Sequence, residues 1–213
     1  MGVGGSVGAA TTVPVNSSSQ PPIPPMVFRV TSGSMEPTYR IGVEVILRAP
    51  VPRVGSVVVF HPPVDAAAEE CGPRPHVVHP GGAACAAPIP KEDKGIEFIK
   101  RVVAGPGDEL EITGGHVFRR ASGKSNFVRE RDPYIRACGA SHECNFPRPI
   151  KIGKGEWFLM GDNRGESDDS RFWGPVPTGW ILGTVTGRAP GSARIPGVPP
   201  TLAIREPAGR PLF

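Results

Sequence analysis

The stretch Ile-Glu-Phe-Ile-Lys-Arg-Val-Val, residues 96–103, decides the fold class, because β-branched and aromatic residues predominate in it. The run is too short for a core helix, and Gly105-Pro106-Gly107-Asp108 ends it with turn-forming residues. Residues 109–112 resume a β-prone pattern, and Gly114-Gly115 predicts a hairpin turn into a further strand at 116–119. Consecutive strands joined by short turns are typical of antiparallel sheets.

The same pattern recurs on both sides of this region. Further strands are predicted at 26–31, 43–47, 56–60, 156–160 and 180–187. The composition agrees, since 28 Gly and 27 Pro among 213 residues interrupt helices too often for a long-helix architecture. We therefore expect a mainly β protein, in which antiparallel β-sheets form a compact core with irregular, disulfide-containing insertions.

Composition shifts along the chain predict its organisation. The β core is expected over 26–119 and 151–190, interrupted by a Pro-, Gly- and Ala-rich surface insertion at 61–95. The polar stretch 120–150 is predicted to be a small, irregular second lobe. Two tails complete the division, a flexible one at 1–25 and an extended one at 191–213.

Four cysteines lie in the loop-like parts of the sequence, at positions 71, 85, 138 and 144. Two disulfides formed in an oxidising compartment are the favoured interpretation, with free thiols and a metal site as the alternatives. No Cys-x-x-Cys pair occurs, so the metal interpretation is the weakest and we expect no metal. Local pairing, Cys71–Cys85 and Cys138–Cys144, is expected because each bond closes a short loop.

The net charge of +4 is compatible with an anionic membrane surface or with nucleic acid. However, the sequence has no dense Lys/Arg run and only two Tyr, so no nucleic-acid partner is expected. No stretch approaches the roughly 18 consecutive apolar residues of a transmembrane helix. Residues 1–25 also lack the pattern of a secretory signal. We therefore expect the chain as given to be soluble.

Three segments carry residues capable of chemistry. They are Ser-Gly-Ser-Met-Glu-Pro-Thr at 32–38, the strand that contains Lys100, and Gly-Asp-Asn-Arg-Gly-Glu-Ser-Asp-Asp-Ser-Arg at 161–171. Each has a purely structural interpretation when taken alone. The first is turn chemistry, the lysine extends to solvent from an apolar strand, and the third is a hydrogen-bonded turn network.

Together, and in this order, the three segments resemble the type I signal peptidase family of serine proteases. The resemblance covers about 35 residues in these motifs and extends more weakly over 26–60 and 96–187. It implies that Ser34 is the nucleophile and Lys100 the general base. It implies that Ser32 and the backbone N–H of Ser34 form the oxyanion hole, and that Ser167 orients the lysine.

Other roles implied by the resemblance concern support and substrate. Asp169 and Arg171 are expected to form a supporting ion pair, and Arg101 follows the base as the family pattern requires. Met35 and Pro37, which flank the nucleophile, are expected to bind substrate. Two residues depart from the pattern, Tyr39 after the first motif and Ser56 at the start of the strand predicted at 56–60, and both fall outside the catalytic positions.

The chemistry of the two residue types agrees with the implied roles. A serine hydroxyl is a weak nucleophile until a base removes its proton. A lysine is such a base only when it is neutral, and apolar surroundings such as residues 96–103 favour the neutral form. The pair replaces the serine–histidine–aspartate arrangement, so the five scattered histidines need not form a cluster.

The resemblance further implies an endopeptidase that removes signal peptides from exported preproteins after an Ala-x-Ala-like site, through an acyl-enzyme and without a cofactor. The expected setting is the extracytoplasmic side of the bacterial cytoplasmic membrane. The expected state is a monomer that meets the lipid surface through an anchor this sequence lacks. Three explanations for the missing anchor stay open. The anchor was removed, the start of the sequence was misassigned, or this member of the family is released from the membrane.

Two other classes stay open at this point. One is another Ser-Lys peptidase of related fold, such as a pilus or conjugation maturation enzyme or a self-cleaving repressor. The other is a non-catalytic, secreted β module. Peptide cleavage separates an enzyme from the β module, and DNA binding identifies the repressor type.

Overall fold

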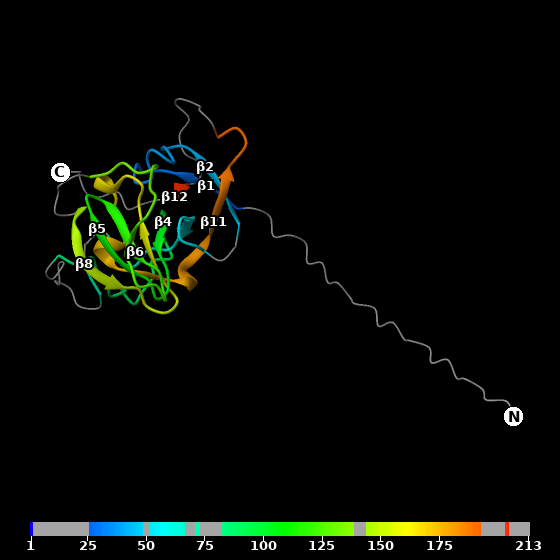
Figure 1. Ribbon diagram of the computed structural model, residues 1–213. Helices are drawn as coiled ribbons and strands as arrows, with labels where there is room; N and C mark the ends of the chain where they lie inside the picture. Colours follow the sequence, from blue (N-terminus) through cyan, green and yellow to red (C-terminus); the bar gives the residue numbers. More distant parts are fainter. Residues whose placement is uncertain are drawn as a thin grey trace.

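The computed structural model describes residues 1, 26–48, 52–66, 71–72, 82–138, 144–192 and 203–204. Two sheets dominate these residues, as Figure 1 shows, which confirms the mainly β prediction. The larger sheet contains β1 (Met26–Val30), β2 (Glu44–Arg48), β3 (Val57–Phe60), β4 (Phe98–Ala104), β9 (Glu156–Met160), β10 (Val176–Pro177), β11 (Ile181–Arg188) and β12 (Ala203–Ile204). The smaller sheet contains β5 (Glu109–Thr113), β6 (His116–Arg120), β7 (Val128–Arg129) and β8 (Phe146–Lys151). Short helical turns are η3 (Arg164–Glu166), α1 (Ser170–Trp173) and η4 (Thr178–Trp180).

The larger sheet has the strand order β10-β9-β4-β3-β11-β2-β1-β12. Its described pairs are antiparallel except β1 with β12, which run parallel. Lys100 lies opposite Val58 of β3, and Arg101 lies opposite Val57 on one side and Met160 of β9 on the other. The sheet therefore holds β4, the strand of the candidate base, between β3 and β9.

The smaller sheet has the order β7-β6-β5-β8. The predicted hairpin is present, and Gly114 and Gly115 both have positive φ at its turn, a conformation that glycine adopts without strain. The strand β8 was not predicted, because its two prolines, Pro147 and Pro149, weaken the β pattern. Proline is tolerated there because β8 lies at the edge of the sheet. The stretch 120–150 thus contributes ordered strands where an irregular lobe was expected.

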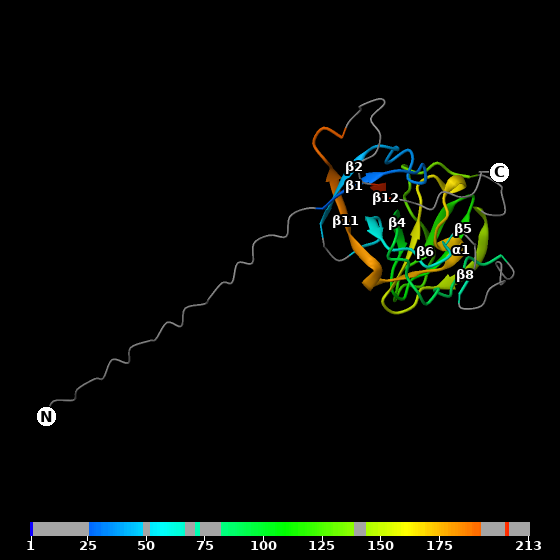
Figure 2. The same cartoon turned by 180° about the vertical axis from the view of Figure 1, so that it is seen from behind.

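One hydrophobic cluster joins the two sheets. It combines buried residues of β3, β4 and β9 with Leu110, Ile112, Val117, Phe146 and Ile150 of the smaller sheet. The helix α1 packs beside the smaller sheet (Figure 2), where the rings of Phe172 and Phe146 meet edge to face with their centroids 6.4 Å apart. All four residues of β3 are buried, as its apolar run predicted.

Both predicted disulfides are present. Cys71 bonds to Cys85 with a Cα–Cα distance of 5.5 Å, and Cys138 bonds to Cys144 with a Cα–Cα distance of 6.0 Å. The first bond fixes the insertion near α1, since the backbone N–H of Cys85 donates to the carbonyl of Arg171 at 2.9 Å. In the described part of the chain, no helix is long and apolar enough to cross a membrane.

Candidate active site

The predicted nucleophile lies in a tight turn that follows β1. The N–H of Glu36 donates to the carbonyl of Gly33 at 3.0 Å, and the N–H of Tyr39 donates to that of Met35 at 2.9 Å. Met35 is fully buried in a second hydrophobic cluster with residues of β1, β2 and β3 and with Ile99 of β4. This burial anchors the turn and holds Ser34 inside the molecule, where it is 2% exposed.

Lys100 is brought to Ser34 by its place on β4. Its ammonium nitrogen, Nζ, donates to the Oγ atom of Ser34 at 2.9 Å, across 66 residues of sequence. The side chain is fully buried, so the interpretation of a lysine that extends to solvent is wrong. Nζ also lies 5.2 Å from the centroid of the Phe98 ring. The amine nitrogen therefore lies within hydrogen-bond reach of the serine hydroxyl, which is the geometry a general base needs.

Ser32 also approaches the nucleophile. Its Oγ atom lies 3.2 Å from the Oγ atom of Ser34, and either hydroxyl can donate. Ser32, Ser34 and Lys100 therefore form one chain of hydrogen bonds. The oxyanion role expected of Ser32 stays a prediction.

Ser167 also lies at the candidate active site, but its hydroxyl does not make the predicted hydrogen bond. It is buried, and its hydroxyl has no hydrogen-bond partner among the described residues, so the predicted bond to Lys100 is not formed in this structure. Its neighbour is Gly161, where an added Cβ would lie 2.2 Å from the Ser167 hydroxyl and 2.5 Å from the carbonyl oxygen of Ser34. Gly161 therefore permits both serines to pack closely.

Asp169 and Arg171 form the expected ion pair. The Nε atom of Arg171 donates to Asp169 at 2.8 Å and its Nη2 donates at 3.0 Å, and both side chains are buried. The backbone N–H of Gly161 also donates to the carboxylate at 3.0 Å. Burial alone would raise the pKa of Asp169, but the charge and hydrogen bonds of Arg171, the Gly161 N–H and the charge of Lys100 together lower it.

Arg101 belongs to a second buried ion pair, with Asp162. Its Nε and Nη2 atoms donate to the two carboxylate oxygens at 2.8 and 2.7 Å, and its Nη1 donates to the carbonyl of Gly55 at 2.7 Å. Burial alone would lower the pKa of Arg101, but the hydrogen bond and charge of Asp162 raise it. Thr38, four residues after the nucleophile, donates its hydroxyl to the same carboxylate at 2.5 Å.

The residue after Asp162 holds the nucleophile turn directly. The backbone N–H of Asn163 donates to the carbonyl of Ser34 at 2.9 Å, and its side-chain amide donates to the carbonyl of Gly33 at 3.3 Å. The same amide donates to Glu166 at 2.9 Å, which fixes its orientation. The loop after β9 therefore positions the main chain on both sides of Ser34.

Arg164 links this loop to the smaller sheet. Its Nε donates to the carbonyl of Gly161 at 2.9 Å, and its Nη1 donates to the carbonyl of Gly115 in the β5–β6 turn. Burial, followed by the charge of Arg171, lowers the pKa of Arg164. The buried guanidinium of Arg164 thus donates hydrogen bonds to one carbonyl after β9 of the larger sheet and to one in a turn of the smaller sheet, and it links the two sheets at the site.

The two residues expected to bind substrate lie apart. The Met35 side chain is in the core, while Pro37 is exposed beside Ser34, so any substrate contact of either residue stays a prediction. The sequence predicted no role for Asp162, Thr38 or Asn163, although all three lie in the motif segments 32–38 and 161–171. No group of His, Cys, Asp and Glu that could hold a metal occurs among the described residues.

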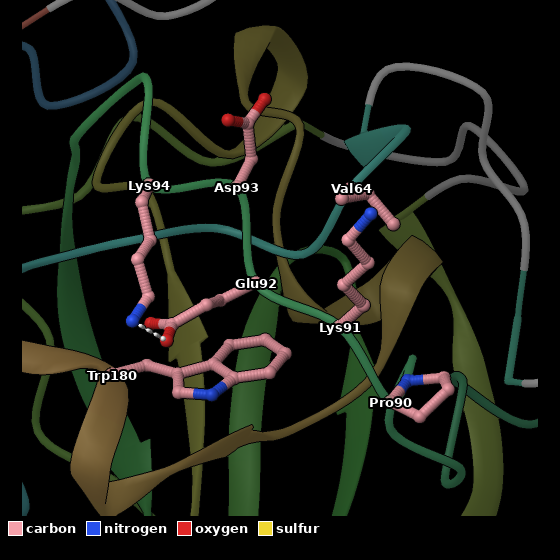
Figure 3. A pocket seen from close by; sticks show the side chains of 7 residues that line it. All are labelled: Val64, Pro90, Lys91, Glu92, Asp93, Lys94 and Trp180. Carbon is pink, nitrogen blue, oxygen red and sulfur yellow. Dashed lines mark ion pairs between the residues drawn. The ribbon is translucent and has the colours of Figure 1, made fainter.

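A surface pocket of about 610 Å³ lies elsewhere, between the base of the insertion and η4 (Figure 3). Lys94 reaches over Trp180 and pairs with Glu92 at 3.1 Å, and Lys91 and Asp93 complete a rim of mixed charge. None of its lining residues belongs to the Ser34–Lys100 site. The candidate active site is therefore defined by its buried polar groups and not by this pocket.

Comparison with known proteins agrees with this geometry. The family model described as "Signal peptidase, peptidase S26" matches residues 24–189, most of the chain. The protein therefore belongs to the signal peptidase family S26. The matched range contains all the residues that form the site.

Individual relatives are more distant. The chain is 29% identical over 160 residues to "Probable signal peptidase I-1" of Synechocystis, covering 72% of this chain and 65% of the relative. It is 30% identical over 159 residues to "Probable signal peptidase I-2" of Synechocystis, covering 72% and 58%. It is 37% identical over 86 residues to "Thylakoidal processing peptidase 1, chloroplastic" of Arabidopsis thaliana, covering 40% and 22%.

The chain thus spans less than two thirds of the length of these relatives. Among solved structures, a signal peptidase I from Enterococcus faecalis matches with a TM-score of 0.40 and 17% identity, covering 65% of this chain and all of that one.

Proposed function

We propose that this chain is the catalytic part of a type I signal peptidase, a serine endopeptidase that works with a Ser34–Lys100 dyad. The observation that carries the proposal is the 2.9 Å hydrogen bond from Lys100 Nζ to Ser34 Oγ at a buried position. A lysine held in this way is within reach of the proton that must leave the nucleophile. Family membership supports the same chemistry.

The first half of the reaction forms an acyl-enzyme. The neutral amine of Lys100 takes the proton of the Ser34 hydroxyl as Oγ bonds to the carbonyl carbon of the scissile peptide. The resulting oxyanion is stabilised by the N–H of Ser34 and the hydroxyl of Ser32. When the carbon–nitrogen bond breaks, the leaving amine takes the proton from the Lys100 ammonium.

The second half releases the signal peptide. Lys100, neutral again, takes a proton from a water molecule that attacks the ester carbonyl. A second tetrahedral oxyanion forms and collapses, and Ser34 recovers its proton from Lys100. Every step uses only these residues and water.

The residues around the dyad support this mechanism by fixing positions. Asn163 bonds to the main chain of Ser34, and Gly161 lets Ser167 pack against it. Asp169 accepts the N–H of Gly161, and its charge is balanced by Arg171. Preorganisation of this kind lowers the cost of assembling the transition state.

The substrate class we propose is an exported preprotein whose signal peptide ends in an Ala-x-Ala-like sequence and binds as an extended strand. We further propose that the chain acts as a monomer at the extracytoplasmic surface of a bacterial membrane. The names of the relatives support the preprotein substrate, since they include signal peptidases and a thylakoidal processing peptidase.

The test is hydrolysis of a peptide that carries an Ala-x-Ala site, followed by mass spectrometry of the products. Ser34→Ala is expected to lower kcat by at least about 10⁴-fold, because no other nucleophile replaces its hydroxyl. Ser125→Ala, at an exposed serine in the smaller sheet's loop, is the matched control and should leave kcat unchanged. A wild-type chain that does not cleave, or a Ser34→Ala variant that does, would refute the proposal.

A further inference from the structure

The segment Tyr134–Arg136, which lies outside all three chemical motifs, reaches the back of the active site. It belongs to the stretch between β7 and β8. Residue 136 forms an isolated parallel bridge with Asn163, in which its N–H donates to the carbonyl of Asp162 at 2.8 Å and its carbonyl accepts from Arg164 at 2.9 Å. The segment therefore adds a strand-like edge to the loop that holds Ser34.

Two side chains of this segment make contacts: the exposed Arg136 pairs with Glu36 at 3.6 Å, and Tyr134 lies against Arg101. The central guanidinium carbon of Arg101 lies 3.9 Å from the centroid of the Tyr134 ring, which is close for a cation–π contact. Arg101 is only 9% exposed, and its nitrogens already donate to Asp162 and Gly55. The tyrosine ring covers one flat face of the guanidinium, so it confines Arg101 to the plane in which both bonds to Asp162 form.

Two hydrogen bonds connect the position of Asp162 to the turn that holds the nucleophile Ser34. Its side chain accepts the hydroxyl of Thr38, which lies in the nucleophile turn, at 2.5 Å. Its neighbour Asn163 donates its backbone N–H to the carbonyl of Ser34 at 2.9 Å. Because Asp162 is completely buried, any tilt of its carboxylate changes the position of the turn and is not absorbed by solvent.

We propose that Tyr134 is a positioning residue for the reaction, which fixes Ser34 through Arg101 and Asp162. The role rests on the proposed signal peptidase function. It assigns a catalytic consequence to the stretch between β7 and β8, since this stretch supplies the group that holds the Arg101–Asp162 pair in place. The face of the ring, not the phenolic hydroxyl, carries the effect.

The consequence for kinetics is specific. A loosened Arg101–Asp162 pair displaces Ser34 relative to Lys100, which slows acylation, while the surface that receives the substrate keeps its shape. Loss of the ring should therefore lower kcat by about 2- to 30-fold, the range that corresponds to measured cation–π strengths, with little change in KM. A phenylalanine keeps the ring and should restore the activity.

The experiment measures kcat and KM on one Ala-x-Ala peptide for wild type, Tyr134→Leu and Tyr134→Phe. The matched control is Phe127→Leu, because Phe127, just before β7, makes a similar contact with Arg120 of β6, at 4.9 Å, away from the site. A second series replaces Tyr134 with phenylalanines that carry more ring fluorines, which weakens the cation–π contact without changing the shape. This series serves even if Tyr134→Leu does not fold.

A lower kcat in Tyr134→Leu at equal KM, recovery in Tyr134→Phe, and a stepwise fall with fluorination support the proposal. Wild-type kcat in Tyr134→Leu or in the most fluorinated variant overturns it. Equal losses in Tyr134→Leu and Phe127→Leu also overturn it, because they indicate general destabilisation of this region of the protein. These results assume an active wild type; an inactive one refutes the proposed function itself, and this role with it.

Discussion

Replacing Asp169 with asparagine tests the electrostatics of the site. The substitution keeps the shape of the side chain but removes the charge that faces Arg171, which is 1% exposed. In the wild type, three donors of Arg171 and the N–H of Gly161 converge on the Asp169 carboxylate. After the change, the guanidinium still donates to the carbonyl of Ser167 at 3.0 Å but no longer faces a carboxylate at position 169.

Breaking a buried pair on one side leaves an uncompensated charge, which typically costs about 3–5 kcal/mol. We therefore expect Asp169→Asn to lower the free energy of unfolding by about that amount at pH 7. The control is Glu92→Gln, whose partner Lys94 is 75% exposed, and this surface pair should contribute less than about 1 kcal/mol.

The effect should depend on pH with a definite sign. The pKa of Asp169 is lowered in the folded protein, so its ionised form stabilises the fold above the unfolded pKa of about 3.9. That contribution is lost as the pH falls through the folded pKa, and an asparagine does not titrate. The difference between wild type and Asp169→Asn should thus be constant from about pH 5 to 8 and shrink by about 1 kcal/mol per pH unit below about pH 4.

Urea unfolding followed by tryptophan fluorescence at pH 7, 5 and 3 measures this difference. Two results would refute the reasoning. One is a difference below about 1 kcal/mol at pH 7, and the other is a difference at pH 3 as large as at pH 7. Either would mean that Asp169 is not an ionised partner of Arg171.

Three further predictions follow from the same geometry. Ser32→Ala should lower kcat by about 10²–10³-fold with KM nearly unchanged, because one donor to the oxyanion is lost, and Ser32→Thr should recover part of the lost kcat. An unchanged kcat in Ser32→Ala would show that Ser32 only shapes the turn. Lys100→Arg should be as inactive as Lys100→Ala on the same peptide, because a guanidinium does not become a neutral base; activity in the arginine variant would exclude that role. Replacing both cysteines of Cys71–Cys85 with serine should lower the free energy of unfolding, measured in urea, by about 3 kcal/mol, and the same change at Cys138–Cys144 by about 2 kcal/mol, because the bonded cysteines are 14 and 6 residues apart. A larger loss at Cys138–Cys144 would contradict the loop-entropy argument.

Local signals predicted most of the strands. The runs 56–60, 109–112, 116–119 and 156–160 each became a strand to within one residue, because β-branched and aromatic residues fit a pleated, half-buried surface in many contexts. The short disulfide loops were also predictable, since nearby cysteines meet at little entropic cost. The strand β8 was missed because its prolines are acceptable only at a sheet edge, and a sequence does not reveal which strand lies there.

For the candidate active site, the sequence by itself determined which reactive functional groups are available. It supplied a serine in a turn, a lysine in an apolar strand, and a polar loop whose motifs resemble one family. It did not determine that Lys100 is fully buried, because an isolated lysine in a strand is equally able to extend to solvent. The tertiary structure removed that choice, because it places the Ser34 turn against the lysine side chain.

The tertiary structure alone decided the partners. Lys100 meets Ser34 across 66 residues, Thr38 meets Asp162 across 124, and Tyr134 covers Arg101 from the stretch between β7 and β8. Contacts over such distances depend on the register of the sheets and the path of the loops, which many residues set together. Short-range preferences fix the conformation of each segment, whereas the burial of charged groups is stable only where the whole fold brings their counterparts to them.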